Sequence, residues 1–288
     1  MNVLFPATVE EALDALRTHP DARVMAGGTD LLVKWRAGSV APGSLVCLEK
    51  AEGIAGIAVR DGHIRIGAAT TMAAILESAP VREHLPLLHQ AAGVFASPPV
   101  RNMATIGGNI CTASPAADTL PPLHVLGAEV EIVSPSGKRR MPIADFVTAP
   151  GKTALAPGEL LGMVAVPVPL PRAIQHYEKV GRRKALAIAV VSLAALLRIE
   201  EGVIEEARLA WGSVGPTIVR CPEAETLLQG RPATIETFRE AGQSVRSAVK
   251  PISDIRASAE YRRQVAANLL LRLAGKAEAT GDRPADAE

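Results

Sequence analysis

The sequence predicts an α+β fold with more than one domain, and three observations lead to this expectation. Helical spacings of apolar residues and short strand-like runs alternate irregularly through the middle of the chain, without a repeated strand–helix–strand unit. A proline-rich segment at residues 166–171 is typical of an extended connector. The length of 288 residues is sufficient for two or three domains.

Residues 1–55 are expected to form a small β-α-β subdomain. Thr8 and Glu11 have the spacing of a capping box in front of an amphipathic helix. Short strands are expected at residues 23–26 and 44–48, and the first of them leads into a glycine pair. Glycine turns at strand ends are common phosphate sites in α/β units.

Residues 56–170 are expected to form a second subdomain of α+β type. Asp61-Gly62 is typical of the type I′ turn of a hairpin. Helices are expected at residues 72–78, 86–95 and 118–126. Strands are expected at residues 128–133 and 159–166.

Residues 171–276 are expected to form a C-terminal domain with a three-stranded antiparallel sheet and a helical bundle. The strands are expected at residues 174–180, 187–199 and 203–211, and the helices at 222–228, 235–249 and 257–274. The second of these strands is so apolar that its pattern also fits a buried helix. The polar residues 277–288 are expected to form a disordered tail.

Composition excludes several classes of function. The net charge is +1 and no long charge run is present, which argues against binding to nucleic acid or to an anionic membrane surface. No apolar run approaches the length of a membrane span, and the N-terminus lacks the features of a signal peptide. The three cysteines are widely spaced, which predicts no metal or iron–sulfur site on this chain. A cytoplasmic protein is expected.

The common catalytic motifs are also missing. Gly151-Lys152-Thr153 resembles the end of a P-loop, but Phe146 occupies the position where that motif needs a glycine. No G-x-G-x-x-G motif and no nucleophile elbow is present. We therefore predict no catalytic residue on this chain.

Two glycine pairs are the strongest candidates for a binding site. They lie in the first segment, residues 26–30, and in the second segment, residues 105–109. Glycine turns can present backbone N–H groups to an anion. Two such segments far apart in the sequence suggest one extended anionic ligand, and a dinucleotide diphosphate is the natural candidate.

The neighbourhood of these segments is similar to a known family. Residues 101–118 closely resemble the second flavin-binding segment of the medium, FAD-binding subunits of molybdenum hydroxylases, the xanthine dehydrogenase and carbon monoxide dehydrogenase family. Residues 26–30 resemble the first such segment, and residues 177–183 resemble the start of the C-terminal domain of these subunits. The resemblance extends in order and spacing from Phe5 to about Gly275.

The resemblance implies the two-subdomain FAD-binding fold of the vanillyl-alcohol-oxidase (PCMH) type, with FAD held non-covalently. It places Asp118 on an adenosine hydroxyl, Phe95 near the flavin, and Leu161 and Lys179 beside the ring system, where a cation stabilises the reduced anion. The residues that it places at the diphosphate are Ala26, Gly27, Gly28, Thr29, Asp30, Thr105, Ile106, Gly107, Gly108 and Asn109.

The same resemblance implies an electron-transfer function in a larger complex. Electrons would come from a molybdopterin-containing large subunit through two [2Fe–2S] clusters of a small subunit, reach FAD on this chain, and pass to an external acceptor. A dimer of heterotrimers is expected, and the substrate and the acceptor are not encoded here. Two alternatives stay open: a free-standing flavin oxidase of the same fold, in which Cys111 is the one nearby side chain for a covalent flavin, and a binding module without a cofactor.

One departure from the family pattern concerns the stretch Leu186-Ala187-Ile188-Ala189. The family often has an aspartate immediately before the Ile-Ala pair, and here that position holds Ala187. Any role of that carboxylate near the flavin or an adjoining subunit is therefore in question for this chain.

Overall fold

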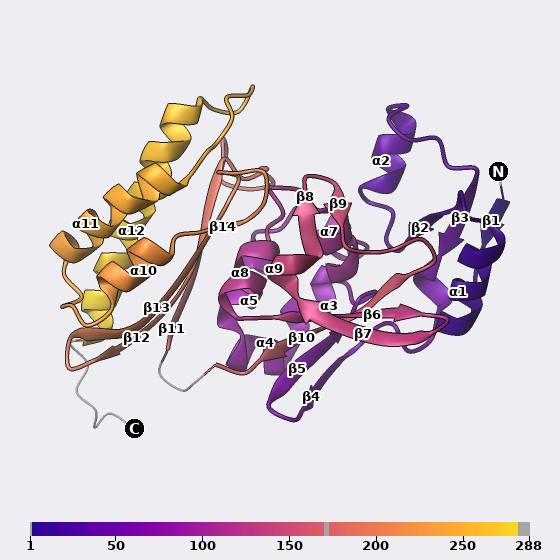
Figure 1. Cartoon of the computed structure of the whole chain (residues 1–288), viewed down its shortest axis with the longest axis horizontal. Coiled ribbons are helices and arrows are strands. Elements are labelled where there is room, and N and C mark those ends of the chain that lie inside the picture. The colour runs from indigo at the N-terminus through magenta and orange to yellow at the C-terminus, as the bar shows by residue number, and fades with distance from the viewer. Residues whose placement is uncertain (1, 170–172, 282–288) are drawn as a thin grey trace. The chain divides into compact units, whose positions relative to one another are not determined.

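The structure, a computed structural model, describes residues 2–169 and 173–281 and divides into two compact units (Figure 1). Unit 1 contains the chain up to His84, Phe95–Ser114 and Gly127–Val168, and unit 2 contains Leu85–Val94, Pro115–Leu126 and the chain from Pro169 onward. Two short segments from the middle of the sequence therefore belong to the C-terminal unit.

Unit 1 begins with a three-stranded parallel sheet in the order β1-β3-β2. Its elements are β1 (Asn2–Leu4), α1 (Val9–Thr18), β2 (Arg23–Met25), α2 (Leu31–Arg36) and β3 (Ser44–Cys47), followed by the 3-10 turn η1 (Leu48–Lys50). The predicted cap of the first helix is confirmed, because the Thr8 hydroxyl accepts a hydrogen bond from the Glu11 N–H. The Glu11 carboxylate in turn accepts from the Ala7 N–H at 2.8 Å.

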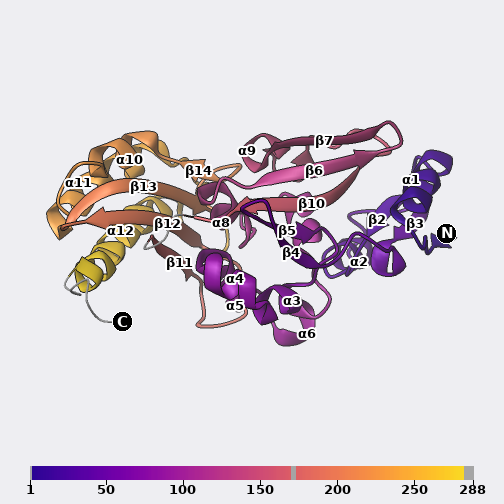
Figure 2. The ribbon, with the colours of Figure 1, turned by 90° about the horizontal axis from the view of Figure 1, so that it is seen from below.

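The second sheet of unit 1 has five antiparallel strands in the order β4-β5-β10-β6-β7, and Figure 2 shows β10 between β5 and β6. The predicted hairpin turn is confirmed, since Asp61 and Gly62 have φ values of 54° and 71°. The strands are β4 (Ile57–Arg60), β5 (His63–Gly67), β6 (Glu129–Ser134), β7 (Gly137–Pro142) and β10 (Leu160–Pro167). The remaining elements are α3 (Met72–Glu77), α4 (Ala79–His84), α6 (Pro98–Arg101), α7 (Ile106–Thr112), α9 (Ile143–Phe146), β8 (Val147–Ala149) and β9 (Lys152–Thr153).

Unit 2 contains a four-stranded antiparallel sheet in the order β11-β12-β13-β14. The strands are β11 (Ile174–Val180), β12 (Val191–Glu200), β13 (Val203–Gly212) and β14 (Val219–Arg220), and the helices are α5 (Pro86–Gly93), α8 (Leu120–Val125), α10 (Pro222–Leu228), α11 (Ile235–Ala248) and α12 (Ala259–Gly281). The helices α10, α11 and α12 cover one face of the sheet (Figure 1), while α5 and α8 also pack against its strands. Trp211, Phe238 and Leu270 are fully buried in the core between sheet and helices.

The structure resolves and corrects several expectations for unit 2. The apolar segment predicted at residues 187–199 is a strand and not a helix, and it begins only at Val191. A short fourth strand, β14, joins the predicted three. The last helix continues through Gly281, beyond the predicted end at residue 274, while residues 282–288 of the predicted tail lie outside the described residues. Within the described ranges, no helix has the length and hydropathy needed to cross a membrane.

Candidate functional site

The first glycine segment lies at the carboxyl end of β2, in a parallel sheet. Gly28 has φ of +69°, a conformation that favours glycine, and α2 begins three residues later. Within the described part of the chain, the N–H groups of Gly27, Gly28 and Thr29 donate to no protein acceptor. Thr29 and Asp30 are exposed. The segment thus presents backbone donors and a hydroxyl group to an external ligand.

The second glycine segment is not the turn that the sequence suggested. Thr105 is the N-cap of α7, and its hydroxyl oxygen accepts from the Gly108 N–H at 3.0 Å. The Ile106 and Gly107 N–H groups donate to the carbonyl groups of Thr70 and Ala68, at 3.0 and 2.8 Å. The expectation that this segment offers free backbone N–H groups is therefore wrong at these positions, because each donates within unit 1.

The two glycine segments, 75 or more residues apart in the sequence, lie against each other in unit 1. A Cβ atom on Gly27 would overlap the carbonyl group of Met103 and would lie 3.1 Å from the Ala104 nitrogen. A second link is the hydrogen bond from the Thr112 hydroxyl to the Asp30 carboxylate, at 3.1 Å. The absence of a side chain at Gly27 is therefore a condition for the close approach of these segments.

The chemistry of this region fits a diphosphate. Three backbone N–H groups without a protein acceptor, together with the Thr29 hydroxyl, form a set of neutral donors. The negative charge of Asp30 is balanced by the Lys34 ammonium at 2.7 Å. The Gly108 backbone is exposed at the start of α7, and a Cβ there would meet only the Thr105 hydroxyl, at 3.0 Å.

Unit 2 holds the predicted residues Asp118 and Lys179 in one buried cluster. The Lys179 ammonium donates to the Asp118 carboxylate at 2.7 Å and to the Val94 carbonyl at 3.2 Å. The Tyr177 hydroxyl donates to the other Asp118 oxygen at 3.1 Å. The side chains of Asp118 and Lys179 are only 7% and 8% exposed, so this lysine is a buried ion-pair partner.

Burial dominates the electrostatics of this cluster. Loss of hydration raises the pKa of the Asp118 carboxyl, and the adjacent Lys179 and Tyr177 side chains offset part of that rise. Burial and the neighbouring Asp118 carboxylate hold the pKa of the Tyr177 hydroxyl well above its ordinary value.

The direct pairing of Asp118 and Lys179 changes their expected roles. The adenosine hydroxyls and the isoalloxazine ring of an extended FAD are separated by the diphosphate and the ribityl chain. Two side chains whose charged atoms are 2.7 Å apart cannot serve both ends of such a molecule. The resemblance places Asp118 and Lys179 at different parts of FAD, whereas the structure pairs their charged atoms directly.

Phe95 and Leu161, the other two predicted residues, lie in unit 1 in different settings. Phe95 is half-buried, and its carbonyl accepts from the Arg101 guanidinium at 2.8 Å. Leu161 is 4% exposed and lies at an irregularity of the β10–β6 pairing. The Leu161 side chain is therefore packed within unit 1.

Cys111 does not fit the role of a covalent flavin anchor. Burial raises the pKa of its thiol to about 12, so the nucleophilic thiolate is essentially absent at neutral pH. All three cysteines of the chain are free thiols.

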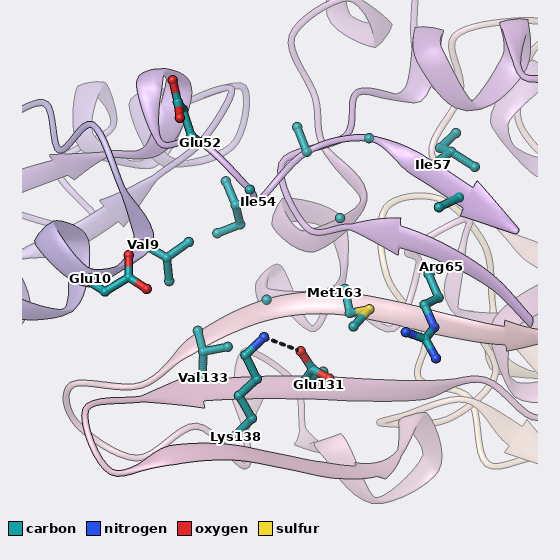
Figure 3. A pocket seen from close by; sticks show the side chains of 16 residues that line it. Val9, Glu10, Glu52, Ile54, Ile57, Arg65, Glu131, Val133, Lys138 and Met163 are labelled. Atoms are coloured by element: carbon teal, nitrogen blue, oxygen red, sulfur yellow. Dashed lines mark ion pairs between the residues drawn. The ribbon is translucent and has the colours of Figure 1, made fainter. Parts of the chain in front are cut away.

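A cavity of about 530 Å³ lies elsewhere in unit 1 (Figure 3). Its lining includes Val9 and Glu10 of α1, Ile54, Met163 of β10, and Glu131, which forms an ion pair with Lys138 at 3.2 Å. None of the sequence-predicted site residues is among the residues that line it.

Comparison with protein families decides the relationship of this chain. A family described as "FAD binding domain in molybdopterin dehydrogenase" matches residues 1–169, and "CO dehydrogenase flavoprotein C-terminal domain" matches residues 175–277. The chain belongs to the FAD-binding subunits of the molybdenum hydroxylases. It is thus a subunit of an oxidoreductase, and FAD is its cofactor.

Individual members of the molybdenum hydroxylase family support this relationship over nearly the whole chain. The xanthine dehydrogenase FAD-binding subunit of Escherichia coli O157:H7 is 38% identical over 261 residues, covering 89% of this chain and 88% of the relative. The carbon monoxide dehydrogenase medium chain of Afipia carboxidovorans is 30% identical, with 95% of each chain covered. A crystal structure of Cu,Mo-CO dehydrogenase matches with a TM-score of 0.93 at 30% identity, over 97% of this chain and 98% of that one.

The residues that contact the predicted site residues were not identified from the sequence. Tyr177 holds Asp118, Met103 is the neighbour of Gly27, and Thr112 is bonded to Asp30. The two-residue spacing of Tyr177 and Lys179 on one strand was a usable signal, because such residues share a face of the sheet.

Proposed function

We propose that this chain is the electron-transfer subunit of a heteromeric molybdenum hydroxylase. Bound FAD would supply the redox chemistry, taking electrons from [2Fe–2S] clusters of a small subunit and giving them to an external acceptor. One observation supports the proposal most strongly: the two glycine segments lie against each other, and the N–H groups of the first segment donate to no protein acceptor in the described part of the chain. The relatives of the chain are FAD-binding subunits.

In this proposal the first glycine segment supplies most of the diphosphate contacts. Gly27, Gly28 and Thr29 donate backbone N–H groups, and Ala26 and Asp30 complete the segment. The second segment, Thr105 to Asn109, brings the Thr105 hydroxyl and the open backbone at Gly108.

The cluster in unit 2 is proposed to serve one end of the cofactor only. We assign Lys179 to the edge of the isoalloxazine, with Asp118 as its counter-ion, and this replaces a contact between Asp118 and the adenosine. Phe95 is proposed to contact the ring system through its side chain, and Leu161, whose side chain is packed within unit 1, through its backbone. Because the ion pair is neutral as a whole, its electrostatic effect on a reduced flavin is smaller than that of a free lysine.

The proposed partners are a small [2Fe–2S] subunit and a large molybdopterin subunit, in a dimer of heterotrimers within the cytoplasm. The names of the relatives support a subunit of a complex more than a free-standing oxidase, because they are called FAD-binding subunits or medium chains. Nothing in the composition favours nucleic acid as a partner.

The test is reconstitution of the purified chain with FAD, followed by addition of the iron–sulfur subunit from the same complex. The expected results are a flavin absorbance spectrum on the isolated chain, no turnover of small substrates by that chain alone, and flavin reduction only when the reduced iron–sulfur subunit is present. Turnover by the isolated chain would instead support the free-standing oxidase. A preparation that takes up no flavin would refute the proposal.

A further inference from the structure

Two neighbouring loops of unit 2 expose an unusual number of aliphatic side chains. Leu186 and Ile188 are 49% and 56% exposed in the loop between β11 and β12, and Ile252 and Ile255 are 73% and 87% exposed in the loop between α11 and α12. The Arg182 guanidinium joins the two loops by donating to the Ile255 carbonyl at 3.0 Å. We call residues 182–188 and 250–256 the basic–apolar patch.

The loop that carries Ile252 and Ile255 is fixed by a network around Asp254. The Asp254 carboxylate accepts from the Arg256 N–H at 2.8 Å, from the Arg256 guanidinium at 2.7 Å and from the Arg262 guanidinium at 2.6 Å. Arg262 is 4% exposed and also donates to the carbonyl groups of Val190 and Ser213. The two isoleucines therefore project from a loop that is tied to the core of unit 2.

The loop that carries Leu186 and Ile188 is also closely packed. The Arg183 side chain donates to the Leu186 carbonyl, and Leu186 has φ of +56°, which is strained for a leucine. A Cβ on Gly181 would lie 2.6 Å from the Ala187 Cβ, so the two ends of the loop are in contact. Both loops therefore expose apolar side chains on a backbone that is held in place. A fixed backbone lowers the entropy cost of binding a partner there.

The charge of the patch indicates what kind of surface can cover it. Arg182, Arg183, Lys184 and Lys250 form no ion pair with any carboxylate in the described ranges. The one acidic residue of the patch, Asp254, is already paired with two arginines. A complementary surface is therefore acidic around an apolar centre. A second copy of this chain is a poor occupant, because a two-fold contact would oppose these cations.

We infer that the basic–apolar patch is the docking surface for the iron–sulfur subunit, and this rests on the proposed function. A protein that holds thiolate-ligated iron–sulfur clusters carries their negative charge, which is opposite in sign to the charge of the patch. The patch also continues directly from Lys179, since β11 ends at Val180 and the first loop follows. Docking there brings the partner to the end of the strand that bears the proposed flavin-edge residue.

The experiment measures binding of the FAD-loaded full-length chain to the separately purified iron–sulfur subunit. The double variant Ile252→Asp, Ile255→Asp is compared with Val59→Asp, a control at a residue of unit 1 that is 54% exposed. We expect the double variant to bind at least about 100-fold more weakly and the control to bind like the wild type. Lys184→Glu with Lys250→Glu should lower the association rate and reduce its dependence on salt. FAD content and melting temperature should stay unchanged in every variant.

The outcomes separate this inference from the proposed function. A wild-type chain that fails to bind FAD or the iron–sulfur subunit refutes the proposed function. If the wild type binds both and the double variant binds equally well, only the docking surface is wrong. The occupant is wrong if the double variant instead loses binding to the molybdenum subunit alone, to a labelled second copy, or to phosphatidylglycerol vesicles.

Discussion

The contact between the two glycine segments leads to a sharp prediction for Gly27→Ala. The φ of Gly27 is outside the left-handed region, so alanine is compatible with the backbone itself. Its Cβ, however, would overlap the Met103 carbonyl, and backbone atoms cannot rotate aside as a flexible side chain can. One of the two segments must retreat by more than about 1 Å before the contact reaches even 3.0 Å.

Overpacking of this kind costs about 1–3 kcal/mol. If the displaced segment is a ligand segment, most of that cost appears in FAD binding, where about 1.4 kcal/mol is a factor of ten. We therefore expect FAD to bind about 10- to 100-fold more weakly to Gly27→Ala. The assay is titration of the FAD-free chain with FAD, followed by flavin fluorescence, together with a thermal melt of the FAD-free protein.

The control is Gly275→Ala in α12, where a new Cβ meets no atom within 4 Å. That variant should bind FAD normally and should be slightly more stable, by about 0.5–1 kcal/mol, because alanine favours the helix. Wild-type FAD affinity and melting temperature in Gly27→Ala would refute the argument that these segments meet at the cofactor.

Three further predictions concern side chains. Asp118→Asn and Lys179→Met should each lower the free energy of unfolding by about 3 kcal/mol, and the double variant should lose clearly less than the sum; additive losses in denaturant titrations would contradict a coupled pair. The pKa of His124 falls from 6.5 to about 4 on folding because the ring is buried. The unfolded chain therefore takes up a proton at His124 before the folded chain does, so the folded state is fully stable above pH 6.5 and loses stability as the pH falls toward 4. Between these pH values the wild type should lose about 3 kcal/mol more than His124→Gln, and parallel pH profiles would exclude this. Cys111→Ser should bind as much FAD as the wild type. If flavin instead stays with the wild-type protein after acid precipitation and is absent from precipitated Cys111→Ser, a covalent bond to Cys111 is indicated.

Local signals predicted much of the fold. Thr8, Asp61 and Gly62 specify a cap and a turn through their own backbone chemistry, and the structure agrees at each. Periodicity could not separate strand from helix at residues 187–199, because a strand buried on both faces loses its alternation. The first seven residues of β12 are all buried, whichever face they point to.

The site was less predictable, because it depends on contacts between distant segments. The glycine pairs pointed to two segments that the structure brings together, but whether an N–H group is free depends on partners such as Ala68 and Thr70, which no local pattern reveals. The pairing of Asp118 with Lys179 likewise joins residues that are 61 positions apart.

The assignment of α5 and α8 to unit 2 has a consequence for how the chain is made. Both helices emerge from the ribosome well before β11, β12 and β13, the strands on which they pack. The apolar faces that these two helices present to the sheet therefore stay without their partner strands until residues 174–212 have been synthesised. Cutting the gene at the proline connector would separate them permanently from their sheet, so the boundary that looks most natural in the sequence is a poor place to divide this protein.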